Sequence, residues 1–247
     1  NSTIRYAKSL GIKTNIYLED FSNGILNSKD YLYFMIKNIK GADRIMLPDT
    51  LGIFNPKQTY RYCKKILDKF PEKKFCFHAH NDYGLAVANS LAAVEAGITR
   101  LHTTVNGLGE RTGNCPLANI VAAIKDHTSY KTSVVEGKLN TVSKLVESIS
   151  GIRVSRNMPI VGESVFTQCC GVHADGDKKG KLYFNKLLPE RFGGQRSYAL
   201  GKTSGKASIQ KNLELLGIQI DEKTQKKVLK RIVNLADRKE KITLSDL

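Results

Sequence analysis

Two histidines, His78 and His80, lie two residues apart in FCFHAHND, where a buried strand is expected to end. Side chains at this spacing share one face of a strand, so both imidazoles would face the same point, as two ligands of one divalent metal must. Taken alone, the pair is equally compatible with two buried, hydrogen-bonded histidines. The neighbouring residues favour chemistry, because Asn81 and Asp82 follow directly and the glycine-punctuated loop NGLGERTGN occupies residues 106–114.

The first half of the chain alternates between short apolar runs and helix-period stretches. Four apolar or β-branched runs each end in polar residues: Lys13–Leu18 before Glu19, Arg44–Leu47 before Asp49 and Thr50, Phe75–Phe77 before His78, and Arg100–Val105 before Asn106. Helical patterns lie near residues 30–39, 56–70, 85–96 and 116–125. Repeated βα units predict an α/β fold with a parallel sheet, whose active residues cluster at the carboxyl ends of the strands.

Four βα units are half of an eight-stranded barrel, and the chain opens on Asn1 inside the helix-like segment STIRYAKSLG. We therefore expect the first strands of a barrel to be missing. A half-barrel has unpaired edge strands, which favours poor solubility or pairing with another element. An open doubly wound sheet is the alternative, but no GxGxxG follows a strand, so dinucleotide binding has little support.

After about Asp126 the pattern changes to a second, smaller region. A helix is expected at Leu139–Ser150, followed by a loop-rich stretch and then by helices with apolar spacing at Ile209, Leu213, Leu216, Val228, Ile232 and Leu235. By residue type alone, His173, Asp175 and Tyr183 of the loop fit surface polar residues and a packing aromatic. In the earlier loop, a charge pair of Glu110 with Arg111 is favoured over a catalytic role.

Composition limits the class of protein. With 41% hydrophobic residues in 247 the chain can bury a core, and it contains neither a run of membrane-spanning length nor a signal-peptide pattern, which favours a cytoplasmic protein. Five cysteines without a CxxC favour reduced thiols. The net charge of +16 is spread as +7 over residues 1–125 and +9 over residues 126–247, which disfavours nucleic acid and favours attraction of anionic substrates.

Several segments resemble the isopropylmalate, homocitrate and citramalate synthase family, the acyl-CoA-condensing branch of the TIM-barrel metallolyases. They are YLED, LPDT, FHAHNDYGLAVANSLAAVEAG, NGLGERTGN, GVHADG and YALGKTSGKASI, and the resemblance runs through nearly the whole chain, from the first of them to the last. Among these synthases, NIYLEDFSNG and LPERFGGQRSYALGKTSGKASI are most similar to citramalate synthases, although similar sequences are also called isopropylmalate synthase.

The resemblance implies a (β/α)8 barrel of which this chain holds strands five to eight, in a partial catalytic domain at residues 1–128. Residues 129–247 would form mostly helical linker subdomains that contribute to the partner subunit's active site in a homodimer. Neither a nucleic acid nor a membrane is an expected partner. The substrates implied are acetyl-CoA and a 2-oxo acid.

The resemblance also implies roles for individual residues. His78 and His80 match two ligands of a divalent metal, which would be Zn, Mn or Mg, and Asn114 matches an asparagine that completes the site. The aspartate of the family's first-strand motif, with its adjacent arginine, is absent from this sequence. Glu19 matches the catalytic glutamate and Thr50 a threonine that binds the keto acid's carboxylate. The linker would supply His173 and Tyr183 for catalysis and Asp175 and Leu182 for substrate binding.

Three residues depart from the pattern, at two places in the chain. Lys181 stands where close relatives have asparagine, which puts the acyl-CoA contact there in question, and Cys169 and Cys170 replace small residues or threonine. Neither position matches a metal ligand.

The chemistry of these residue types agrees with a Claisen condensation, which needs a base for the methyl of acetyl-CoA and a polarised ketone in the 2-oxo acid. Pyruvate, giving (R)-citramalate, is the favoured acceptor, with 2-oxoisovalerate or the homocitrate synthase substrate as alternatives. A metal-dependent C–C lyase of the same superfamily is a second class, disfavoured by the LPERFG and LGKTSGKASI segments. A non-catalytic basic binding module is a third.

Overall fold

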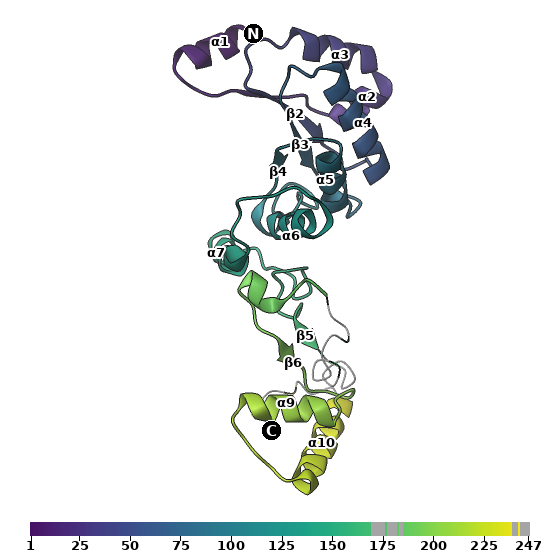
Figure 1. Ribbon diagram of the computed structural model, residues 1–247, viewed down its shortest axis with the longest axis vertical. Helices are drawn as coiled ribbons and strands as arrows, with labels where there is room; N and C mark the ends of the chain where they lie inside the picture. The colour runs from purple at the N-terminus through teal and green to yellow at the C-terminus, as the bar shows by residue number, and fades with distance from the viewer. Residues whose placement is uncertain (169–175, 177–181, 183–184, 239–241, 243–247) are drawn as a thin grey trace. The chain divides into compact units, whose positions relative to one another are not determined.

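The computed structural model describes residues 1–168, 176, 182, 185–238 and 242. The chain divides into two compact units (Figure 1). The first comprises Asn1–Glu136 with Val142–Ile152, and the second comprises Gly137–Thr141 with Arg153–Leu247. The division of roles after residue 128 remains a prediction, because the two units are distinguished by packing alone.

The first unit is built around a four-stranded parallel sheet with the strand order β1-β2-β3-β4. Its strands are β1 (Asn15–Tyr17), β2 (Arg44–Asp49), β3 (Phe75–Ala79) and β4 (Leu101–His102). Its helices are α1 (Ser2–Ser9), α2 (Phe21–Asn27), α3 (Lys29–Asn38), α4 (Pro56–Lys69), α5 (Ala86–Glu95) and α6 (Leu117–His127), with a 3-10 turn η1 (Val105–Gly107) after β4. Helices connect successive parallel strands, as this pairing requires. The α/β fold predicted from the sequence is confirmed.

The two faces of the sheet differ in chemistry, because successive side chains of a strand alternate between them. On one face, buried residues of β2 and β3 such as Leu47 and Phe77 join a hydrophobic core with α3, α4, α5 and α6. On the other face, the register aligns Tyr17, Met46 and Cys76 in one row and places His78 beside His102 in the next. The helix-covered face is therefore apolar except for the buried Asp49, and the opposite face carries Tyr17 and the histidines.

Helix α4 begins where the sequence dictates. Asn55 accepts a hydrogen bond from the backbone N–H of Gln58 at 2.9 Å, and the Gln58 side chain accepts one from the Asn55 N–H at 3.1 Å. Pro56 occupies the first helical position, where a missing N–H costs nothing. This reciprocal cap fixes the direction in which the chain leaves the loop after β2.

The buried carboxylate of Asp49 organises that same loop. It accepts hydrogen bonds from the Ser22 hydroxyl of α2, from the Ile53 N–H at 3.0 Å and from the Phe54 N–H at 3.2 Å. Burial raises the pKa of Asp49 above its ordinary value, although these three hydrogen bonds and the charge of His80 oppose the shift. Asp49 is thus a structural residue, and the neighbouring Thr50 is the one that reaches the candidate site.

Replacing Asp49 should show both effects. We expect Asp49→Ala to lower the free energy of unfolding by at least about 2 kcal/mol, because two buried N–H groups lose their acceptor. Since the folded-state pKa is raised, protonation favours the folded chain, and this contribution to stability falls as pH rises through the folded pKa. Urea unfolding should therefore show the stability of wild type, relative to that of Asp49→Asn, increasing as the pH is lowered towards the ordinary pKa of an aspartate, about 4. If wild type instead loses stability relative to Asp49→Asn on acidification, the assignment is wrong.

The second unit contains β5 (Thr167–Gln168) paired in parallel with β6 (Ser197–Tyr198). It also contains the 3-10 turn η3 (Pro189–Phe192) and the helices α9 (Lys206–Leu215) and α10 (Glu222–Asp237), while η2 (Glu136–Lys138) and α7 (Leu139–Ser150) lie where the two units divide. Ile209, Leu213 and Ile232 form its small core. The apolar spacing predicted these three residues, but Leu216 at the C-cap of α9 is 41% exposed and does not belong to the core.

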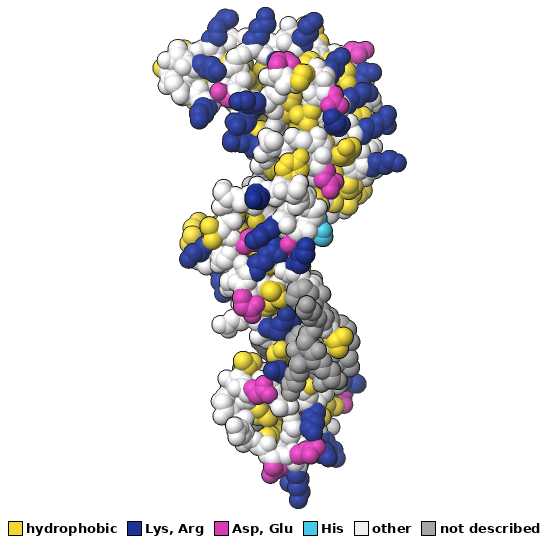
Figure 2. All heavy atoms as spheres, in the orientation of Figure 1, with side chains coloured by type: hydrophobic (Ala, Val, Ile, Leu, Met, Phe, Trp, Pro, Cys, Tyr) yellow, Lys and Arg dark blue, Asp and Glu magenta, His cyan; other side chains and the backbone are white. Residues whose placement is uncertain are grey.

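Two surface properties bear on partners. Among the described residues, no helix combines the length and hydrophobicity that crossing a bilayer requires. On the face drawn in Figure 2, lysine and arginine side chains are interspersed with acidic, hydrophobic and neutral groups and do not gather in one stripe.

Candidate functional site

The candidate site lies at the carboxyl ends of the parallel strands, on the polar face of the sheet. The rings of His78 and His80 have centroids 5.0 Å apart and are nearly perpendicular, at 88°. The Nδ1 atom of each ring is buried and has no hydrogen-bond partner among the described residues. Buried polar atoms without a partner are rare and destabilising, so two such atoms on neighbouring rings are candidates for binding a ligand.

The environment of His78 keeps its ring neutral. Burial lowers its pKa to about 4, with further lowering by the charges of His80 and His102, while a hydrogen bond to the His102 backbone and the charge of Glu19 act in the opposite direction. A neutral imidazole is the form that binds a metal. His78 is therefore ready for coordination at neutral pH without having to lose a proton.

Asn114 lies next to this pair. Its backbone forms an isolated antiparallel bridge with His80, and its amide nitrogen donates to the Leu108 carbonyl at 3.0 Å. That bond leaves the Oδ1 atom as the free group, and Oδ1 is buried without a partner among the described residues. Two imidazole nitrogens and one amide oxygen are donors that suit Zn or Mn.

This donor set fits a divalent metal but does not complete its coordination shell. Within the described part of the chain, no three His, Cys, Asp or Glu side chains are grouped so that they could hold an ion. A tetrahedral or octahedral ion would need further oxygen ligands from a substrate, water or another segment.

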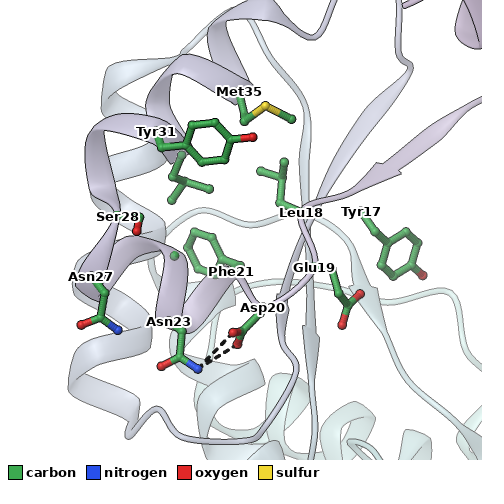
Figure 3. Close-up of a pocket in the computed structure, with 12 residues that line it drawn as sticks. Tyr17, Leu18, Glu19, Asp20, Phe21, Asn23, Asn27, Ser28, Tyr31 and Met35 are labelled. Atoms are coloured by element: carbon green, nitrogen blue, oxygen red, sulfur yellow. Dashed lines mark hydrogen bonds between the residues drawn. The ribbon is translucent and has the colours of Figure 1, made fainter.

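Glu19 and Thr50 come together at the ends of β1 and β2. The Thr50 hydroxyl donates to Glu19 Oε1 at 2.9 Å and accepts from the Asp20 N–H at 3.0 Å. In Figure 3, Glu19 and Tyr17 point to one side of the β1 end, while Leu18, Tyr31 and Met35 lie on the other side against α2 and α3. The exposed carboxylate of Glu19 is thus presented on the polar face of the sheet, where the two histidines lie.

Two residues of this face were not predicted from the sequence. The Tyr17 hydroxyl lies 2.8 Å from His102 Nδ1, and the His102 ring centroid lies 6.3 Å from that of His78. Tyr17 precedes Glu19 by two residues, and His102 stands in a strand run at the level of His78. Strand periodicity places Tyr17 on the same face as Glu19, so it could have been found; His102 requires knowledge of the register between β3 and β4.

The loop that carries Asn114 is held by an ion pair that the sequence did not indicate. Arg111 pairs with Asp82 through two bonds, Nε–Oδ1 at 2.8 Å and Nη2–Oδ2 at 3.1 Å, while Glu110 lies 3.7 Å away. The hydrogen bond from Arg111 is the largest effect that lowers the pKa of Asp82. The expected structural role of Arg111 stands, but its main partner is Asp82.

Of the linker residues with predicted roles, the structure describes only Leu182. His173, Asp175 and Tyr183 lie outside the described residues, as do Cys169, Cys170 and Lys181. Leu182 is described and is 54% exposed. Their roles therefore remain predictions.

Gly109 leaves the space that Asn114 occupies. A Cβ at Gly109 would lie 2.2 Å from the Asn114 amide nitrogen, closer than real contacts allow. We expect Gly109→Ala to lower the free energy of unfolding by about 1–3 kcal/mol, because the amide must leave its buried place. Gly24→Ala is the matched control, since its added methyl group meets only open space in α2. Equal stability of the two variants in urea unfolding would argue against a tightly packed Asn114.

Comparison with known families places this site in context. The family model HMGL-like matches residues 1–146, more than half of the chain. The chain belongs to the HMGL-like family. A second family model, homocitrate synthase post-HMGL domain-like, matches residues 160–240. The HMGL-like segment contains Glu19, Thr50, both histidines and Asn114.

Curated relatives of this HMGL-like chain carry the names of three synthases. It is 39% identical to a homocitrate synthase of Sulfolobus acidocaldarius over 93% of the chain and 49% of the relative. Two relatives from Methanopyrus kandleri are a putative (R)-citramalate synthase (36% identity, 99% of the chain, 48% of the relative) and a probable 2-isopropylmalate synthase (38%, 95% and 47%). The synthase family predicted from the motifs is confirmed. The chain spans about half the length of these relatives.

Solved structures agree on the fold. An HMG-CoA lyase from Bacillus subtilis matches 63% of the chain and 56% of its own length, with a TM-score of 0.50 and 26% identity. The carboxyl transferase domain of Rhizobium etli pyruvate carboxylase, solved with oxalate, matches 98% of the chain and 40% of its own length, with a TM-score of 0.51 and 16% identity. At that identity, the second match is evidence of fold alone.

Proposed function

We propose that this chain supplies the fifth to eighth strands of a (β/α)8 barrel. Each outer strand, β1 and β4, has one strand partner among the described residues, which leaves two edges for further strands. A cavity of about 430 Å³ opens beside β1, and its lining includes Leu18, Phe21, Tyr31 and Met35 (Figure 3). Tyr31, which lines this cavity, is 66% exposed. The lining is therefore an apolar surface that further βα units would cover.

We further propose that the completed barrel condenses acetyl-CoA with a 2-oxo acid and then hydrolyses the thioester. The observation that carries this proposal is the pair of imidazoles whose buried Nδ1 atoms have no partner in the described part of the chain, together with the Glu19–Thr50 hydrogen bond. A divalent metal bound by His78, His80 and Asn114 would polarise the ketone of the acid. In the structure, the Nδ1 atoms of both rings and the Oδ1 atom of Asn114 are buried and have no hydrogen-bond partner among the described residues.

The roles of the remaining residues follow from their positions. Glu19 is the group that takes a proton from the methyl carbon of acetyl-CoA, because its carboxylate is exposed beside the histidines. The Thr50 hydroxyl, which donates to Glu19 here, can rotate to donate to the carboxylate of the 2-oxo acid. His173 and Tyr183 would assist from the linker, and Asp175 and Leu182 would contact the acyl-CoA.

Among 2-oxo acids we propose pyruvate, which gives (R)-citramalate, on the basis of the linker motifs. The alternatives are 2-oxoisovalerate and 2-oxoglutarate, since relatives named for three different products have nearly equal identity to the chain. The match of residues 160–240 to a homocitrate synthase domain supports a synthase over a lyase.

The linker residues lead us to propose a homodimer in which each linker reaches the partner's site. Leu145 and Ile149 support this proposal, because they are apolar side chains one turn apart on α7 and are 56% and 77% exposed. We also propose a cytoplasmic location, which suits the three described cysteines, Cys63, Cys76 and Cys115, all of them free thiols.

The test is free thiol release by the complete polypeptide that carries this sequence. Acetyl-CoA is offered with pyruvate, 2-oxoisovalerate or 2-oxoglutarate, before and after chelation and after return of Zn, Mn or Mg. We expect chelator-sensitive release that is fastest with pyruvate. If free thiol is released only with 2-oxoisovalerate or 2-oxoglutarate, that acid is the acceptor in place of pyruvate. If no thiol is released with any of the three acids, the proposed condensation is refuted.

A further inference from the structure

Arg111 joins three loops that the sequence places far apart. Its guanidinium makes two bonds to Asp82, which follows β3, and Nη2 also donates to the Thr50 backbone carbonyl, after β2, at 2.6 Å. Arg111 itself lies in the loop after β4, with a left-handed φ of 55°. A non-glycine residue in this region is uncommon and is kept only where its surroundings require it.

The residues on either side of this connection belong to the candidate site. Asp82 lies two residues after His80, and Arg111 lies three residues before Asn114. The Thr50 whose carbonyl accepts from Arg111 uses its hydroxyl to bond Glu19. Hydrogen bonds therefore connect Asp82 to Arg111 and Arg111 to the Thr50 backbone, and the Thr50 side chain in turn bonds the proposed base.

The loops are packed closely enough for this connection to set positions. A Cβ at Gly52 would lie 3.0 Å from the Asp82 nitrogen, from Asp82 Oδ2 and from the His80 carbonyl oxygen. The Asn81 N–H donates to the Gly113 carbonyl at 2.9 Å, which ties the loop of β3 to that of β4. The Arg111 side chain is 32% exposed and that of Asp82 24%, so this is a half-buried, two-bond pair and not a loose surface contact.

We propose that Arg111, held by Asp82, is a positioning residue that fixes Thr50 for binding the 2-oxo acid's carboxylate. This inference rests on the proposed condensation and names a residue to which no role in that reaction has been given. The planar guanidinium can bind Asp82 with two bonds while a third N–H reaches Thr50, which the single ammonium of lysine cannot reproduce. Arg111→Lys should therefore impair the site although the charge is retained.

The test compares Arg111→Lys and Asp82→Asn with Glu110→Gln in the complete polypeptide. Glu110 is the matched control, because its side chain is 79% exposed and 3.7 Å from Arg111. We expect Arg111→Lys and Asp82→Asn each to raise the KM for the 2-oxo acid by about tenfold to a hundredfold. The KM for acetyl-CoA should change little, because Thr50 faces the acid.

Two further measurements separate positioning from general stability. Arg111→Lys placed in a Thr50→Val background should raise the KM for the 2-oxo acid little further. Arg111 is proposed to act by positioning the Thr50 hydroxyl, which Thr50→Val has already removed. Hydrogen exchange of residues 105–114 should quicken in Arg111→Lys but not in Glu110→Gln.

The outcomes of these measurements are distinct. If wild type releases no thiol, the condensation itself fails. If wild type is active and Arg111→Lys and Asp82→Asn have the same KM for the 2-oxo acid as Glu110→Gln, the positioning role is overturned while the proposed function stands. Fully additive losses in the Arg111→Lys, Thr50→Val double variant would overturn the positioning role in the same way.

Discussion

Removing either imidazole should abolish the reaction. We expect His78→Ala and His80→Ala each to lower the rate of thiol release by roughly a thousandfold or more, because polarisation of the ketone is worth several kcal/mol of barrier. Each variant should also lose most of its affinity for the divalent metal in an equilibrium titration. The reason lies in the structure, where both rings hold a buried nitrogen that has no partner among the described residues.

The control for these variants is His127→Ala. His127 ends α6 and is exposed, so its loss should change neither metal affinity nor rate. Full activity in His78→Ala would mean that the two rings are ordinary buried histidines. If a variant loses activity but keeps its metal affinity, the metal site does not include the replaced histidine.

Replacing the proposed base should remove activity without removing the metal. We expect Glu19→Gln to reduce kcat by about 10²–10⁴-fold, the usual contribution of a positioned general base. Metal affinity should remain, because Glu19 acts on substrate and is not among the unpartnered buried donors. The Thr50 hydroxyl can still donate to the amide oxygen, so the local hydrogen bond should survive.

Glu95→Gln, an exposed change at the end of α5, is the matched control for loss of a glutamate charge. The solvent deuterium exchange of acetyl-CoA's methyl protons offers a second readout, and it should slow in Glu19→Gln. If kcat of Glu19→Gln equals that of wild type, the proton acceptor is a different residue.

The elements that sequence reasoning recovered are those with strong local signals. The periodic stretches gave α4, α5 and α6 to within about two residues at each end. Helix α2 was missed because FSNGILN contains Asn and Gly, which are poor helix formers. Its Ser22 hydroxyl bonds the buried carboxylate of Asp49, a tertiary contact that local propensity does not contain.

The site divides in the same way. Strand periodicity was sufficient to bring His78 and His80 onto one face, because only a local spacing of two was needed. Tyr17 with His102, and Arg111 with Asp82, depend on which strands are neighbours and on their register, since the members of each pair are 85 and 29 residues apart. Asp49 was grouped with the chemically useful residues because exposed and buried carboxylates look alike in a sequence.

Diffraction from crystals of the complete polypeptide grown with Mn and pyruvate, collected at a wavelength where Mn scatters anomalously, would test the central claim. We expect an anomalous peak within bonding distance of His78 and His80, with the amide oxygen of Asn114 facing it and the pyruvate carboxylate near Thr50. A metal bound away from both histidines, or two rings hydrogen-bonded to protein groups with no ion between them, would contradict it.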